Sequence, residues 1–213
     1  MSVQGFMQFI LDCALHPRQA ARSAHGIYRP WTIVALISAA CALVTGVGVW
    51  IRLRTETDSD LFSYTSPGNA GSEALIEMAI TFLLLIISYP LGLFIWKKVL
   101  GFKAQTIGVQ AAMVASFGLA LVLSPIIEIL STGLWATDTV EESLPWLAYF
   151  AVSFVLTTYY FSESLAISYA SALFKNFLAT GLMLFVLVLP FAAVVAVPII
   201  AGSALVAATG IEQ

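Results

Sequence analysis

The sequence is poor in charge. Only 10% of its 213 residues are charged, whereas 60% are hydrophobic, and the mean hydropathy is +0.96. A soluble domain carries about 25% charged residues, and no single core of this length could bury so much apolar surface in water. These values exclude a soluble globular enzyme, a disordered chain and a collagen-like chain. They leave a polytopic membrane protein.

Cysteine and histidine are also scarce, with two of each. Cys13 precedes the first apolar run and Cys41 lies within it, which argues against a disulfide framework. Cys13, His16 and His25 lack the spacing of a tetrahedral metal site. The sequence contains no HExxH, GxSxG, P-loop or GxGxxG motif. It therefore predicts a protein that is not an enzyme, with no catalytic, cofactor-binding or metal-binding residues.

Long apolar runs are what the sequence has in abundance. Crossing a hydrocarbon core of about 30 Å takes about 20 apolar residues, and five runs meet this length: 31–51, 78–96, 107–130, 145–165 and 177–201. Every tryptophan lies at or just outside an end of one of these runs, as expected for a residue that prefers the membrane interface: Trp31, Trp50, Trp96, Trp135 and Trp146. We predict an all-α protein with a five-helix transmembrane domain over 31–206 and an extracytoplasmic tail over 207–213.

The few charges are distributed unevenly along the chain. Seven of the nine basic residues fall on one side of the predicted spans: Arg18, Arg22, Arg29, Lys97, Lys98, Lys103 and Lys175. The opposite side carries most of the acids, in the polar turn-rich segment 52–77 and in the connection between the third and fourth spans. Because cytoplasmic loops carry the excess of Lys and Arg, we predict a cytoplasmic N-terminus and an extracytoplasmic C-terminus. The net charge of −3 argues against nucleic-acid binding.

The segment 1–30 is predicted to form two short amphipathic helices ahead of the first span. The first has an apolar face with helical spacing: Val3, Phe6, Met7, Ile10 and Ala14. Pro17 separates it from the second, because proline has no N–H to donate. The second helix carries Arg18, Arg22 and Arg29 on one side, which suits contact with lipid headgroups or with a partner. The alternative is that these arginines only fix the topology.

Two acids inside the predicted spans are candidates for function. Glu128 lies near the outer end of the third span and Glu163 near the cytoplasmic end of the fourth. Intramembrane acids mark ion or substrate paths by default, although at headgroup level a carboxylate costs little, and both hypotheses stay open. Four prolines interrupt the spans, as in the broken helices of transporters and also in inert kinked bundles: Pro90, Pro125, Pro190 and Pro198.

The run "LHPRQAAR" at 15–22, Pro30 before the first span, and five spans with the N-terminus inside resemble the Yip1 family, and in particular the bacterial Yip1-domain proteins. The resemblance implies a five-helix integral protein of the cytoplasmic (inner) membrane without known catalysis. The Asp-Leu-Tyr-Gly-Pro motif of the eukaryotic members is absent, so the resemblance implies no small-GTPase partner and carries over no functional residues.

Two functional hypotheses follow. The first is a membrane-organising or partner-binding component, with membrane lipids as partners and, in addition, another membrane protein or a second copy of the chain. The second is a component of a small-molecule or lipid transporter that uses the proline-kinked helices. A polar cavity within the membrane would favour transport, and a dry bundle with a large face of small residues would favour a scaffold.

Overall fold

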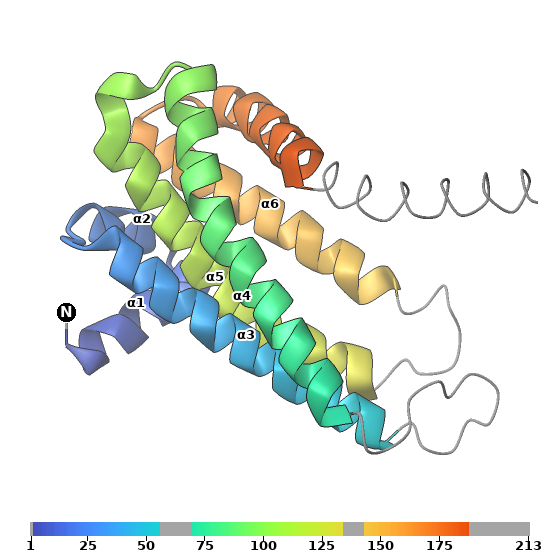
Figure 1. Ribbon diagram of the computed structural model, residues 1–213. Coiled ribbons are helices and arrows are strands. Elements are labelled where there is room, and N and C mark those ends of the chain that lie inside the picture. Colours follow the sequence, from blue (N-terminus) through green and yellow to red (C-terminus); the bar gives the residue numbers. More distant parts are fainter. Residues whose placement is uncertain (1, 56–69, 134–142, 188–213) are drawn as a thin grey trace, which may run out of the picture.

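The computed structural model describes residues 2–55, 70–133 and 143–187, which form helices joined by short turns (Figure 1). Within these described residues, four helices are long and apolar enough to cross a membrane: Pro30–Ile51, Ala70–Val99, Lys103–Ile129 and Tyr169–Leu187. This confirms the helical class and supports a membrane-embedded protein. The number is one fewer than the five predicted spans.

The described elements follow one another along the chain in a simple order. They are α1 (Val3–Leu15), α2 (Pro17–His25), α3 (Pro30–Thr55), α4 (Ala70–Phe94), the π-helical turn η1 (Ile95–Val99), the 3₁₀ turn η2 (Lys103–Gln105), α5 (Thr106–Gly133) and α6 (Ser143–Leu165). A further helix, Tyr169–Leu187, follows α6.

The first and third predicted spans lie within α3 and α5, but the second begins earlier than its apolar run. Helix α4 starts at Ala70 and not at Met78, so residues 70–77 are helical and do not belong to a loop. Glu73 lies in the first turn of α4, where a carboxylate is favoured by the helix dipole. Helix α4 therefore extends beyond its apolar run at the N-terminal end, and Glu73 and Glu77 both belong to it.

The two remaining predicted spans differ more from the structure. The span 145–165 coincides with α6, which is not among the four helices found long and apolar enough within the described residues. The span 177–201 corresponds in part to the helix Tyr169–Leu187. Residues 188–201, with Pro190 and Pro198, and the tail 207–213 lie outside the described residues.

Helix α5 is at the centre of the bundle. It packs against α3 and α6 and also against both N-terminal helices, while α3 packs in addition against α4. Ala111, Ala112 and Ala115 on α5 are fully buried, and such small side chains let neighbouring helices approach closely. Where α5 crosses α6 there is no room for a side chain, because a Cβ atom on Gly108 would lie 2.5 Å from the carbonyl oxygen of Ser164.

Long helices that follow one another in the chain run in opposite directions, so the bundle has two ends (Figure 1). We call the end at which α3 and α5 begin the basic end, since it carries Arg18, Arg22, Arg29, Lys97, Lys98, Lys103 and Lys175, and the opposite one the far end (Figure 1). Trp96 lies at the basic end, at the edge of its predicted span, but its side chain faces inward. It is buried and stacks on Phe161, with ring centroids 3.7 Å apart. It therefore packs in the protein core, whereas Trp31 and Trp50 are exposed.

Candidate functional site

The N-terminal helices α1 and α2 dock onto the bundle as a hairpin against α5, and α2 also contacts α6. Phe9, Ile10 and Cys13 are the buried apolar residues of α1. Gly118 of α5 makes room for them, because a Cβ atom there would lie 2.6 Å from the Cys13 Sγ. The hydroxyl of Tyr160 donates a hydrogen bond to the carbonyl oxygen of Cys13. The hairpin is thus held by a close helix crossing and by a buried polar contact.

Two polar clusters also involve the hairpin. Asp12 is buried, and its Oδ1 accepts a hydrogen bond from Gln8 Nε2 at 3.0 Å. The same oxygen lies 3.3 Å from His16 Nδ1, which donates a hydrogen bond to it when that nitrogen carries a proton. Glu163 Oε1 accepts hydrogen bonds from Arg18 Nη2 at 3.2 Å and from the Tyr159 hydroxyl at 3.1 Å. The hydrogen bond and the charge of Glu163 raise the pKa of Arg18. The structure therefore brings two predicted candidates together, Glu163 and Arg18, as a link between α6 and α2.

A groove of about 610 Å³ lies beside this link at the basic end. It is lined by His16, Pro17, Arg18, Gln19, Arg22 and Tyr159. Within the described chain Arg22 has no ion-pair partner, and its side chain is exposed. Arg29 is also exposed but does not line the groove. Two of the three predicted arginines therefore share one concave, positively charged surface, which fits an anionic group.

The outer face of α1 is apolar. Val3, Met7, Leu11 and Leu15 recur every four residues and are all exposed, with Val3 at 82%; we call them the α1 stripe. The predicted apolar face is thus divided, because Ile10 and the partly buried Phe6 pack on the bundle while Val3 and Met7 face outward. Nothing in the spacing alone could reveal this division, because α1 is apolar on two sides. An apolar stripe beside a basic groove matches the two parts of a phospholipid.

The buried thiol of Cys13 gives a direct test of the docked hairpin. Burial, together with the charge of Asp12, raises the pKa of Cys13 from 9.0 to about 12, which lowers the fraction of reactive thiolate near neutral pH. We expect N-ethylmaleimide to leave Cys13 unmodified in the folded chain and to modify it after denaturation. A cysteine introduced by Ser23→Cys, on the exposed side of α2, is the reactive control. Equal labelling of Cys13 and of the introduced thiol would contradict the docking.

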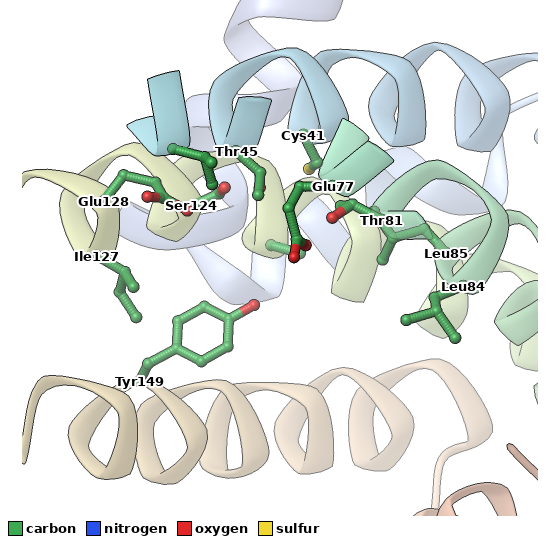
Figure 2. A pocket seen from close by; sticks show the side chains of 12 residues that line it. Cys41, Thr45, Glu77, Thr81, Leu84, Leu85, Ser124, Ile127, Glu128 and Tyr149 are labelled. Carbon is green, nitrogen blue, oxygen red and sulfur yellow. The ribbon is translucent and has the colours of Figure 1, made fainter. Parts of the chain in front are cut away.

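A second polar feature lies towards the far end, between α3, α4, α5 and α6. Glu128 of α5 lines a cavity of about 390 Å³ together with Glu77 of α4 (Figure 2). Sequence reasoning missed Glu77, because it was assigned to the polar segment 52–77. Its spacing from Thr81 and Leu84 does place all three on one helical face, a signal that appears once the helix is known to start at Ala70. Glu128 and Glu163 are not brought together.

Two glycines of α3 allow the helices around this cavity to approach. A Cβ atom on Gly48 would lie 2.4 Å from Glu128 Oε2, and one on Gly46 would lie 2.1 Å from Met78 Cγ. The two positions therefore face different neighbours, α5 and α4. The Gly46-Val47-Gly48 sequence therefore serves helix packing.

Comparison of the chain with protein-family models, with curated proteins and with solved structures finds no match. Within residues 2–55, 70–133 and 143–187, no group of three or more His, Cys, Asp or Glu side chains could hold a metal ion. The two cysteines are free and buried. What the fold and the two sites define is a helical, membrane-embedded protein with a basic groove at one end and an acid-lined cavity towards the other.

Proposed function

We propose that the chain is a non-enzymatic integral membrane protein that organises lipid, or a partner, at its basic end, in the manner suggested by its resemblance to bacterial Yip1-domain proteins. In this proposal α6 is a fifth membrane-spanning helix, beside the four that are apolar enough by themselves. The basic end faces the cytoplasm and the C-terminus lies outside the cytoplasmic (inner) membrane. The clustering of basic side chains at one end of the bundle supports this orientation.

The observation that carries the proposal is the docked hairpin, with the basic groove beside the α1 stripe. An apolar stripe exposed to water is unfavourable by about 25 cal/mol per Å² of surface, whereas in the membrane interface it contacts acyl chains. At that depth the groove meets the phosphate groups of the lipids. Arginine side chains bind phosphate through two parallel hydrogen bonds, and Arg22 is available for this. We infer that the groove binds the headgroup of an anionic phospholipid.

Lipid retention tests this function. The purified chain is expected to retain phosphatidylglycerol in preference to phosphatidylcholine when native mass spectrometry counts the bound lipids. In this proposal Arg22 donates hydrogen bonds to the charged phosphate, each worth about 1.5 kcal/mol, so Arg22→Gln is expected to lower phosphatidylglycerol retention by about tenfold. Lys98→Gln is the matched control, because it removes one exposed charge at the same end but outside the groove.

Two outcomes would reject the lipid proposal. One is equal retention of the two lipids by the wild-type chain, and the other is an equal effect of Arg22→Gln and Lys98→Gln. If a stoichiometric protein, or a second copy of the chain, is retained in place of lipid, the basic end binds that partner and the lipid assignment is wrong.

A second candidate function, as a component of a transporter, is favoured by one observation. The cavity towards the far end is lined by carboxylates and hydroxyls between helices, and substrate sites of transporters are polar sites of this kind within the membrane. Pro125, which lies inside α5, is three residues from Glu128. Uptake of a solute by vesicles that contain the purified chain, and not by empty vesicles, is the outcome expected for this function.

A further inference from the structure

A further cavity, of about 200 Å³, lies between α4, α5, α6 and the helix Tyr169–Leu187. We call it the aromatic cavity, because three aromatic rings line it: Trp96, Phe117 and Phe161. It adjoins the acid-lined cavity, with which it shares Leu85 and Ala120. None of its described lining residues is Asp, Glu, Lys, Arg or His. An ion in this cavity would have no counter-charge, so the lining fits a neutral molecule.

The walls of the aromatic cavity combine rigid and adaptable side chains. Trp96 and Phe161 are both buried and stack on each other, with ring centroids 3.7 Å apart. Met113 and Met183 also line the cavity, and their flexible thioethers adapt to the outline of a ligand and contact aromatic rings favourably. An apolar cavity of about 150 Å³ is large enough for a benzene ring. A volume of about 200 Å³ therefore admits an aromatic molecule slightly larger than benzene.

The amide of Asn176 supplies one oriented polar group. This side chain lines the cavity, and the residue is only 4% exposed. The Thr158 hydroxyl donates its hydrogen to the carbonyl oxygen of Phe154 at 2.7 Å, so the Thr158 oxygen can only accept. The Asn176 atom that lies 2.9 Å from it is therefore Nδ2. Within the described residues Asn176 Oδ1 accepts no hydrogen bond, and it is the amide atom that remains for the cavity.

Two serines that line the cavity are acceptors as well. The hydroxyls of Ser88 and Ser116 each donate to a carbonyl oxygen one turn earlier in their own helix, at 2.6 Å and 2.8 Å. Their hydrogens are thus committed, and like Asn176 Oδ1 they present lone pairs. The hydroxyls of Thr157 and Thr180 can rotate to either role. A matching ligand therefore donates a hydrogen bond, because a buried acceptor that is left unpaired lowers affinity.

We propose that the aromatic cavity binds a neutral aromatic molecule of one or two fused rings, whose N–H or O–H group donates a hydrogen bond to Asn176 Oδ1. The rings of the ligand pack against the aromatic and methionine side chains. The inference is independent of the lipid-binding function and does not involve the carboxylates of the acid-lined cavity.

Thermal unfolding of the chain in phosphatidylcholine nanodiscs tests the proposal. Indole is the probe, and benzothiophene is the control, because it has the same two fused rings with sulfur in place of the N–H group. Indole is expected to raise the unfolding temperature to a saturating limit, since a ligand that binds only the folded state stabilises it. Benzothiophene should need a concentration about fivefold higher or more for half-saturation, because it leaves the acceptor unpaired.

A cavity-filling variant locates the bound indole. Ala179 is buried and lines the cavity, so the larger side chain of Ala179→Leu would occupy part of the space. This variant is expected to weaken indole binding at least about tenfold. Gly181→Leu is the matched control, because Gly181 lies two residues further along the same helix, outside the cavity and with nothing within 4 Å of its Cβ position. It should leave indole binding unchanged.

A second pair of variants tests the acceptor. Asn176→Leu removes Oδ1 and is expected to abolish the preference for indole over benzothiophene. Thr158→Val removes the same hydrogen bond between α6 and the helix Tyr169–Leu187 but keeps the Asn176 oxygen, so the preference should persist. This comparison separates ligand binding from a purely structural role of Asn176. The comparison of the two compounds on the wild-type chain needs no variant and remains decisive if Asn176→Leu does not fold.

Four outcomes would overturn the proposal. Equal half-saturation by the two compounds on the wild-type chain would show that no acceptor recognises the N–H group. A shift that does not saturate would be explained by partition into the lipid. Equal effects of Ala179→Leu and Gly181→Leu would place the indole outside the cavity. A preference for indole that survives in Asn176→Leu would assign the hydrogen bond to another group.

Discussion

Replacing Gly108 by alanine is expected to lower the free energy of unfolding by about 1–3 kcal/mol, the usual cost of inserting a group into a packed core. The added Cβ atom would lie 2.5 Å from the carbonyl oxygen of Ser164 and 3.0 Å from Leu165 Cδ2. The oxygen belongs to the backbone of α6, so no change of side-chain rotamer can remove the overlap. The two helices must separate at their crossing. Reversible unfolding of the purified chain measures the loss.

The glycines of the chain offer graded controls for this prediction. Gly181, in the helix Tyr169–Leu187, has nothing within 4 Å of its Cβ position, so Gly181→Ala should be neutral or slightly stabilising, as alanine is preferred to glycine in helices. Gly92→Ala should fall between, because the atom it meets is the flexible end of Met113, Cε at 2.4 Å. A cost of Gly108→Ala no greater than that of Gly181→Ala would contradict a close backbone contact between α5 and α6.

Hydropathy predicted α3 and α5 well, because a helix that crosses the hydrocarbon core is predominantly apolar along its whole length. It is a weaker guide to α6, where polar side chains have partners inside the bundle. Asn176 Nδ2 donates a hydrogen bond to Thr158 Oγ1 at 2.9 Å, and Tyr160 donates to α1. A hydropathy value counts each hydroxyl group as unfavourable in the membrane. It takes no account of the hydrogen bond that the group makes with another helix.

The same limit applies to the candidate sites. The arginines of the hairpin were identified from their spacing, but the partner of Arg18 lies 145 residues further along the chain, a separation that local patterns do not cover. Glu77 was missed for a different reason. Its acidity, and that of Glu73, suggested a loop, whereas helix formation depends on the backbone and tolerates charge near an N-terminus. The Arg18–Glu163 contact and the position of Glu77 both concern polar residues, whose placement depends on tertiary contacts.

Gly118→Ala is the second substitution expected to have a large effect, and here the overlap can be reversed. The new Cβ atom would lie 2.6 Å from the Sγ of Cys13, whereas the next nearest atom, Phe9 Cε1, is 3.4 Å away. Gly118→Ala alone should therefore lower the free energy of unfolding by about 1–3 kcal/mol and loosen α1 from α5. Increased cleavage of the N-terminal segment by protease would report the loosening.

Cys13→Ala removes the only atom within 3 Å of the new Cβ, so the two substitutions should compensate each other. In a double-mutant cycle the pair is expected to be more stable than the sum of the single effects by about 1 kcal/mol or more, which is typical of residues in direct contact. The same truncation should not rescue Gly108→Ala, whose obstacle is backbone. Additive effects at Gly118 and Cys13 would contradict the α1–α5 contact. Because that contact positions the α1 stripe and the basic groove, Gly118→Ala should also weaken phosphatidylglycerol retention, and Cys13→Ala should restore it.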